Sequence, residues 1–407
     1  MRSTWVVGVW LLQAGCLMAP GSKSNSTDAG PGDGGVAAHV FPPEGTAFHL
    51  VGAFAQDLDD DGDDELILVD GDDSDGAGIY VVLGGEKGFG KVTFTPLEGT
   101  PQAAWYGEGV GANSEAGLAI LMVNDGDLEI HTAVWDVVVA TTRQLSVAEP
   151  PEGELREITG ARFAGADVSS HLMVRTDEGL FFAPGLASPI EFSPMSPSDA
   201  FFAATFWPTS GGDYQFTAAV SDRRVLWWED DLAEMAANAT AAAVDFARFV
   251  PLVDGQANRC ATHVAASRAV VYWASLDCND FGFQAGLFAD NLDLDSAAEN
   301  FLDSASGNLN APPRDLVLLG SSGDGLTLQV YTDLEATSPT VIGGSHALRM
   351  PLSMADSSST HRLILADVEG DGSALVYVVA ENGSMSCARV RSNELEACES
   401  DFSFRTP

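Results

Sequence analysis

The residues with the clearest chemistry form an acidic loop between Asp57 and Leu66. Its carboxylates stand at loop positions one, three, five and nine, and Gly62 at position six allows a sharp turn. The residue at position seven can add a backbone carbonyl. Hard oxygen ligands at this spacing suit Ca²⁺, and without a cation the carboxylates would repel one another. The sequence therefore predicts a calcium site, with a solvated acidic turn as the alternative. Its acidic residues are Asp57, Asp59, Asp61, Asp63 and Glu65.

A second copy of the loop lies near the end of the chain. Asp367, Glu369 and Asp371 repeat positions one, three and five, so they are predicted to bind a second calcium ion. Position nine holds Leu375 in place of an acid, which predicts a weaker site. Another acidic cluster is interpreted either as a further ion site or as an exposed acidic turn; it comprises Asp70, Asp72, Asp73 and Asp75.

The elements that position these loops are predicted to be β-strands. Apolar runs at Leu50–Ala55 and Leu66–Val69 flank the first loop, where an EF-hand would have helices. A unit of apolar strand, short polar turn and apolar strand recurs along the chain, with turns such as Asp125-Gly126 that permit positive φ. The seven predicted hairpins join Glu65–Val69 to Gly78–Leu83, Leu118–Val123 to Leu128–Val134, Leu172–Arg175 to Leu180–Ala183, Tyr214–Val220 to Val225–Trp228, His263–Ala266 to Ala269–Ala274, Leu316–Leu319 to Leu326–Tyr331, and Leu375–Ala380 to Ser384–Val390.

The hairpin spacing, roughly 45 to 58 residues, is typical of propeller blades with four strands each. Short apolar runs such as Ala203–Phe206 precede the hairpins and are predicted to be the innermost strands. Seven hairpins predict an all-β, seven-bladed β-propeller, with two unrelated β-sandwiches as the alternative. The best helical candidate, Leu232–Phe246, is interpreted as a loop or short helix, and Asp401–Phe404 is expected to form the outer strand of the last blade.

The first loop resembles the FG-GAP/VCBS repeat family, in which a Phe precedes alternating Asp residues and an acid-Leu pair follows the Gly. Phe54, Asp57 and Gly62 match this pattern, and so does the pair Glu65-Leu66. By motif the resemblance covers only the first and last units, because the middle five lack the carboxylates. The family implies a seven-bladed calcium-binding propeller, as in integrin head domains.

The N-terminus has the features of an export signal, with Arg2 before a short apolar run that ends near Cys16. We interpret 1–15 as a signal peptide, 16–43 as a flexible tether and 44–407 as the propeller. Cys16 resembles the lipidated residue of a bacterial lipobox, and simple secretion or a retained anchor is the alternative. All three place the chain outside the cell or at its surface, where disulfides persist. The hairpin register predicts two: Cys260–Cys278 and Cys387–Cys398.

The composition narrows the function classes. A formal net charge of −40 repels phosphate backbones and anionic membranes, which argues against nucleic-acid partners and leaves a lipid at Cys16 as the membrane contact. No known catalytic motif is present, so we expect a surface binding or adhesion module for an unidentified protein or glycan ligand. The alternative is an extracellular enzyme that acts on polysaccharide or another polymer through acids in the channel.

Two tryptophans next to predicted loops, Trp105 and Trp207, are candidates for an aromatic ligand platform. The alternative is that they pack between blades.

Overall fold

A computed structural model describes the following residues: 48–72, 77–84, 92–107, 109–111, 115–136, 139–162, 170–186, 188–196, 201–208, 214–221, 224–229, 234–239, 249–252, 259–267, 270–277, 283–287, 300–307, 309, 315–322, 325–332, 335–338, 341–343, 346–352, 361–391 and 394–398. Between 201 and 300 the description concerns the backbone alone. The chain divides into Met1–Ala37 and Ala38–Pro407, and every described residue belongs to the second unit. The expected signal peptide and tether, including Cys16, lie outside the described residues.

All elements of the described residues are β-strands, and they form seven sheets of four or five strands and one two-stranded sheet. The first three sheets contain β1 (Leu50–Gln56), β2 (Glu65–Asp70), β3 (Gly78–Val82) and β4 (Val92–Pro96); β5 (Thr100–Gly107), β6 (Gly117–Asn124), β7 (Asp127–Asp136), β8 (Val139–Glu149) and β12 (Ile190–Glu191); and β9 (Leu155–Arg162), β10 (Ser170–Thr176), β11 (Leu180–Ala183) and β13 (Ser193–Ser196). Pairing is antiparallel except where β12 lies parallel to β8.

The remaining sheets follow in chain order. They contain β14 (Phe201–Pro208), β15 (Tyr214–Ser221), β16 (Arg224–Glu229) and β17 (Glu234–Ala239); β18 (Phe249–Leu252), β19 (Arg259–Ser267), β20 (Val270–Asp277) and β21 (Phe283–Leu287); β22 (Asn300–Gly307), β23 (Asp315–Ser322), β24 (Gly325–Thr332) and β27 (His346–Leu352); and β28 (His361–Ala366), β29 (Leu375–Ala380), β30 (Met385–Arg391) and β31 (Glu394–Ala397). The small sheet pairs β25 (Glu335–Ser338) with β26 (Val341–Gly343).

The seven predicted hairpins are confirmed as the second and third strands of the seven larger sheets. At the β6–β7 turn, Asp125 has φ +52° and Gly126 has φ +93°, the left-handed pair that a two-residue hairpin needs. The interpretation of Leu232–Phe246 as a loop or short helix was wrong for Glu234–Ala239, which forms the edge strand β17. Backbone pairing with β16 outweighs the weak strand propensity of its alanines.

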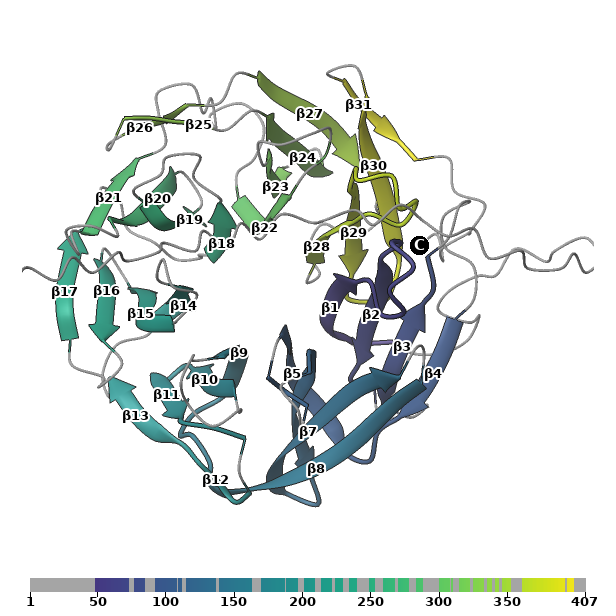
Figure 1. Ribbon diagram of the computed structural model, residues 1–407, viewed down its shortest axis with the longest axis vertical. Helices are drawn as coiled ribbons and strands as arrows, with labels where there is room; N and C mark the ends of the chain where they lie inside the picture. The colour runs from purple at the N-terminus through teal and green to yellow at the C-terminus, as the bar shows by residue number, and fades with distance from the viewer. Residues whose placement is uncertain are drawn as a thin grey trace, which may run out of the picture. The chain divides into compact units, whose positions relative to one another are not determined.

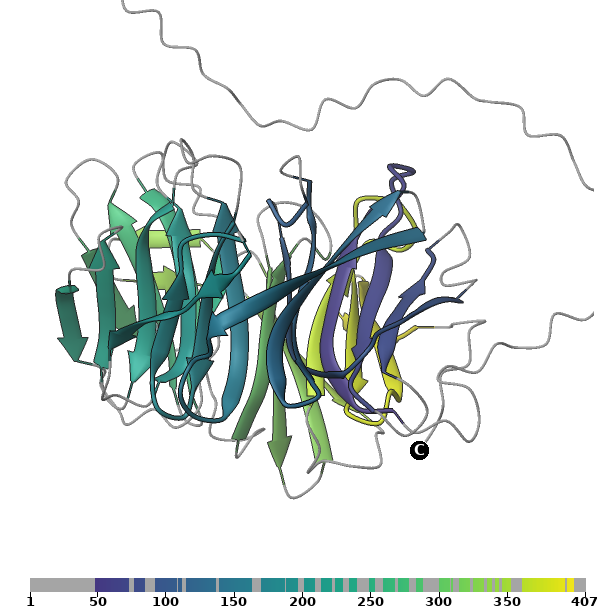
Figure 2. The same ribbon diagram turned by 90° about the horizontal axis from the view of Figure 1, so that it is seen from below.

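The sheets stand side by side around a ring, with their first strands innermost (Figures 1 and 2). The innermost strands contact one another in the order β1, β5, β9, β14, β18, β22 and β28, and β28 contacts β1. Each sheet is therefore covered by a neighbour on both faces, which explains why β2 and β29 are buried at every position.

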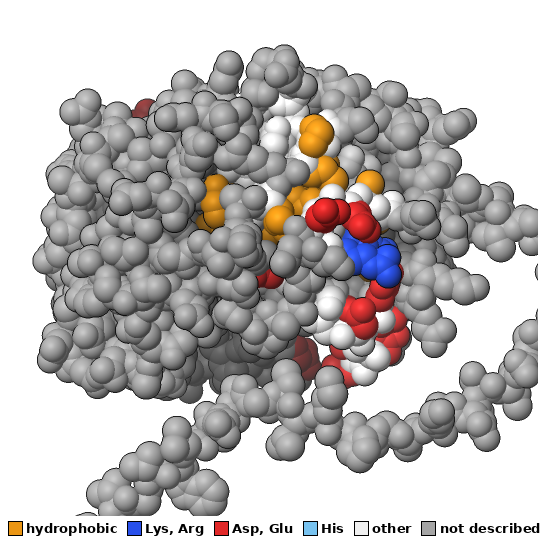
Figure 3. Space-filling model, turned by 90° about the horizontal axis from the view of Figure 1, so that it is seen from above, with side chains coloured by type: hydrophobic (Ala, Val, Ile, Leu, Met, Phe, Trp, Pro, Cys, Tyr) orange, Lys and Arg blue, Asp and Glu red, His pale blue; other side chains and the backbone are white. Residues whose placement is uncertain are grey.

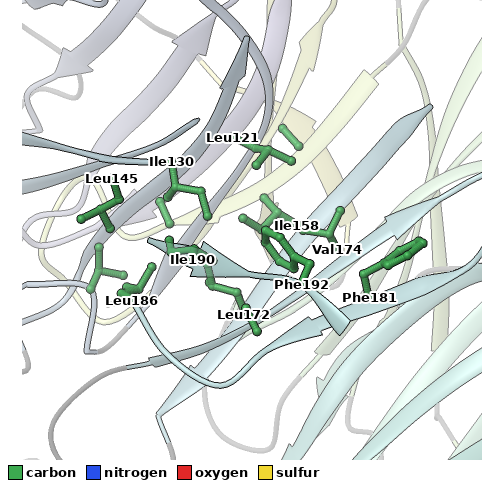
Figure 4. Close-up of a cluster of buried hydrophobic side chains, with 14 residues drawn as sticks. Leu121, Ile130, Leu145, Ile158, Leu172, Val174, Phe181, Leu186, Ile190 and Phe192 are labelled. Atoms are coloured by element: carbon green, nitrogen blue, oxygen red, sulfur yellow. The ribbon is translucent and has the colours of Figure 1, made fainter. Parts of the chain in front are cut away.

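Apolar side chains fill the spaces between the sheets. Figure 4 shows one such cluster, in which Leu121 and Ile130 of the second sheet pack with Leu172 and Val174 of the third. Ile190 of β12 joins this cluster, so the excursion of the chain between β11 and β13 also ties the two sheets together. No described segment is a helix that is long and apolar enough to cross a membrane.

The first and last sheets meet without exchanging a described strand. The outermost described strand of the last sheet is β31, and Asp401–Phe404, which was expected to form the outer strand, lies outside the described residues. The predicted disulfide Cys387–Cys398 is confirmed and joins β30 to the end of β31, with the two Cα atoms 5.3 Å apart. Cys278, and with it the predicted pair Cys260–Cys278, is outside the described residues.

Candidate metal centre

The first acidic loop connects β1 to β2 and is folded by its own carboxylates. Asp57 accepts hydrogen bonds from the backbone N–H of Asp61 at 3.2 Å and of Gly62 at 3.1 Å. The Asp61 carboxylate accepts one from the N–H of Asp63 at 2.9 Å. Positive φ values of +58° at Asp60 and +97° at Gly62 let the backbone turn inward at those two positions.

Three of the predicted ligands are brought together. Asp57, Asp59 and Asp61 each offer one carboxylate oxygen, and these oxygens all lie within 4.8 Å of one another. Calcium binds oxygen at about 2.3–2.6 Å, so two ligands on opposite sides of one ion lie about 5 Å apart. The spacing and chemistry of these three carboxylates therefore fit a single calcium ion.

Glu65 lies apart from this group and binds backbone instead. Its side chain accepts hydrogen bonds from the N–H of Leu58 at 2.8 Å and of Gly84 at 3.3 Å, which fastens the loop to the end of β3. Glu65 is 2% exposed, and this burial raises the pKa of its carboxyl to about 7. Burial also raises the pKa of Asp63, and the charges of Asp61 and Asp367 add to this shift.

The second loop, between β28 and β29, has the same backbone design. Asp367 accepts hydrogen bonds from the N–H of Asp371 at 3.1 Å and of Gly372 at 2.7 Å, as Asp57 does in the first loop. Asp371 accepts one from Ser373 at 2.9 Å. Gly370 and Gly372 have φ values of +61° and +85°, at the positions of Asp60 and Gly62. The two loops therefore adopt one fold at both ends of the chain.

The second loop holds fewer carboxylates than the first. Glu369 at position three lies 3.5 Å from the guanidinium of Arg389, so its charge is directed toward β30. Ser373 replaces the acid at position seven. Among the described residues, only the first loop gathers three metal-ligating side chains.

The charged groups on one face of the described surface are mainly acidic. On the described part of the face shown in Figure 3, acidic side chains are more common than basic ones, in line with the net charge of −40.

The two loops also bind each other across the boundary between the first and last sheets, which we call the seam. The N–H of Asp64 donates to the carbonyl of Asp367 at 2.8 Å, and the N–H of Asp367 donates to the Asp64 carboxylate at 2.7 Å. At the other end of the seam, the N–H of Leu50 donates to the carbonyl of Glu381 at 2.9 Å. Sequence reasoning missed Asp64 because its partner is 303 residues away.

The described members of the other acidic cluster have backbone partners. Asp70 is 1% exposed and accepts hydrogen bonds from the N–H of His49 and of Asp72, both at 2.9 Å. These bonds shape the turn after β2, which is a structural role. Asp73 and Asp75 lie outside the described residues.

No family model matches the sequence, and no curated protein is similar to it. Solved structures are similar in fold. One of them is BBS1N, an N-terminal β-propeller crystallised in complex with ARL6DN. The alignment covers 86% of this chain and 94% of BBS1N, with 12% sequence identity and a TM-score of 0.53. A second crystal of the same complex gives 14% identity and a TM-score of 0.52, with 86% and 95% covered. The chain has a β-propeller fold. At this identity the likeness concerns the propeller fold alone.

The raised pKa of Glu65 predicts how the stability of the protein depends on pH when a chelator has removed calcium. Because the pKa of Glu65 is raised to about 7 from 4.5, the folded propeller binds more protons than the unfolded chain between these values. Stability is therefore expected to fall as pH rises from about 4.5 to 7, with up to about 3 kcal/mol from this residue. Chemical denaturation across this range measures the slope, and Glu65→Gln should flatten it. If stability depended on pH equally steeply in Glu65→Gln, Glu65 would not be the source of the pH dependence.

Proposed function

We propose that this chain is an extracellular, calcium-binding, seven-bladed β-propeller of the FG-GAP/VCBS type that serves as a surface binding or adhesion module. The observation that carries the proposal is the pair of loops with the same hydrogen bonds and the same left-handed positions, one of which gathers three carboxylates. The seven larger sheets supply the proposed blades.

In the proposed centre, Asp57, Asp59 and Asp61 are the side chains that hold calcium. The backbone carbonyl of Asp63 is a further proposed ligand in the manner of the family, whereas the Glu65 carboxylate accepts two backbone N–H groups and holds the loop in place. Asp367, Glu369 and Asp371 form the proposed weaker centre. Bound calcium neutralises the repulsion between carboxylates, and because it binds the folded state it adds stability. Extracellular calcium modules bind with dissociation constants of about 10⁻⁴–10⁻³ M, which suits a site with few ligands.

We propose that the central cavity binds a ligand and does not catalyse a reaction. Glu157 and Asp303 line the central cavity, but both carboxylates have structural partners. Glu157 pairs with Arg175 at 3.0 Å, and Asp303 accepts a hydrogen bond from the N–H of Leu363 at 2.9 Å. Export through the segment 1–15, with a lipid at Cys16 or by simple secretion, would place this module at the cell surface or beyond it.

Calcium titration of the purified chain tests the proposal. Calcium is expected to raise the melting temperature of the wild type, whereas Asp59→Ala should lose most of this shift because one of the three gathered oxygens is gone. Isothermal titration calorimetry should show at least a tenfold weaker affinity in this variant. Asp60→Asn is the matched control, since it removes one charge from the same loop outside the gathered group and tolerates positive φ. Equal calcium responses in wild type and Asp59→Ala would contradict the site.

A further inference from the structure

A cavity of about 340 Å³ opens among the innermost strands of the propeller. Its described lining comes from β1, β5, β9, β22 and β28, so five blades contribute to one space. Cavities that bind small molecules typically measure about 300–1,000 Å³ and combine an aromatic wall with a few well-placed polar groups. The volume leaves room for about one or two six-membered rings.

Trp105 of β5 supplies the aromatic wall. Its side chain is partly exposed and lines the cavity. Two glycines make room for its ring: a Cβ atom on Gly160 of β9 would lie 2.5 Å from a ring carbon, and one on Gly107 would also clash with it. The ring thus packs closely against the backbone of β5 and β9, so the tryptophan side chain loses less entropy when a ligand stacks on it.

Polar groups of both signs surround this ring. Arg156 is an exposed cavity residue whose ion pair with Glu154, 2.8 Å, lies in solvent and is readily exchanged. Asp303 is oriented by the N–H groups of Leu363 and Ser304. The hydroxyl of Ser304, another lining residue, is buried and has no hydrogen-bond partner within the described part of the chain. The cavity is therefore lined by a donor at Arg156 and acceptors at Asp303 beside the aromatic side chain of Trp105, whereas the Ser304 oxygen itself is enclosed.

We propose that this cavity binds a saccharide of one or two rings, which deepens the proposed binding function and rests on it. A sugar ring has an apolar face of C–H groups that stacks on Trp105 and a rim of hydroxyls that both donate and accept hydrogen bonds. A simple anion fits less well, because acids accompany the arginines here and the chain carries −40 charges. A purely apolar ligand would desolvate the charged groups without replacing their hydrogen bonds.

Titration of the full chain with maltose, cellobiose, chitobiose and digalacturonate tests this assignment. At least one disaccharide is expected to change the tryptophan fluorescence and to bind with a measurable heat. Arg156→Gln should weaken that binding at least tenfold, whereas Glu154→Gln should leave it within twofold, because it breaks the same ion pair from outside the cavity. Trp105→Phe keeps an aromatic side chain in the fold and is expected to weaken binding about fivefold or more.

Several results would overturn the assignment. No binding by any of the four disaccharides would remove the saccharide class. Equal effects of Arg156→Gln and Glu154→Gln would show that the ion pair, and not the cavity wall, matters. Binding unaffected by Arg156→Gln and Trp105→Phe would place the sugar elsewhere. Calcium-dependent stabilisation of the same samples is recorded in parallel, so that failure of saccharide binding is distinguished from failure of the calcium centre.

Discussion

Replacing Asp64 with alanine is expected to loosen the seam between the first and last blades and to lower the free energy of unfolding by about 1–3 kcal/mol. The Asp64 carboxylate is the acceptor for the N–H of Asp367, so its removal leaves that donor without its partner at a partly buried contact. A ring depends on every boundary between its blades, and in the described residues no strand is shared across this one.

Hydrogen exchange measured by mass spectrometry separates this effect from general destabilisation. Asp64→Ala should speed exchange in the loop 367–373 and in β28, although these are remote in sequence, and leave β10 and β11 unchanged. Asp64→Asn retains an oxygen acceptor at the same place and is expected to stay close to the wild type. Uniformly faster exchange in all blades, or no change at the second loop, would show that the contact does not hold the seam.

Mutations at the contact between Trp105 and Gly160 are expected to lower the free energy of unfolding the most. Trp105→Ala should cost about 3 kcal/mol, since the partly exposed ring packs between two blades and a cavity remains. Gly160→Ala should cost about 1–3 kcal/mol in the wild type, because its Cβ would lie 2.5 Å from the ring. In the Trp105→Ala background the same methyl group enters empty space, so its cost should vanish or change sign.

A double-mutant cycle by urea denaturation measures this coupling, which we expect to be about 1–3 kcal/mol. Gly126→Ala is the control, because its φ of +93° makes the substitution strained while nothing lies within 4 Å of the added atom. That strain should be the same with and without Trp105. Additive effects of Trp105→Ala and Gly160→Ala would contradict the wedged arrangement of the ring.

The local features of this protein follow from the sequence. Turn residues such as Asp125 and Gly126 predict their hairpin, because the positive φ they adopt depends on the residues themselves. The inward fold of the first loop is local in the same way, since Asp57 reaches backbone groups only four and five residues ahead. The pairing of Cys387 with Cys398 follows from the register of one hairpin.

Contacts between distant segments were decided by the tertiary structure alone. Glu65 has the spacing of a metal ligand, but burial and the N–H of Gly84 give its carboxylate a structural partner that spacing does not reveal. Asp64 looks like one more acid in a run until ring closure brings Asp367 to it. Trp105 gains its place beside the cavity because a neighbouring blade offers a glycine. Side-chain spacing encodes what lies within a few residues, whereas the closure of the ring determines which blades meet and therefore what each side chain contacts.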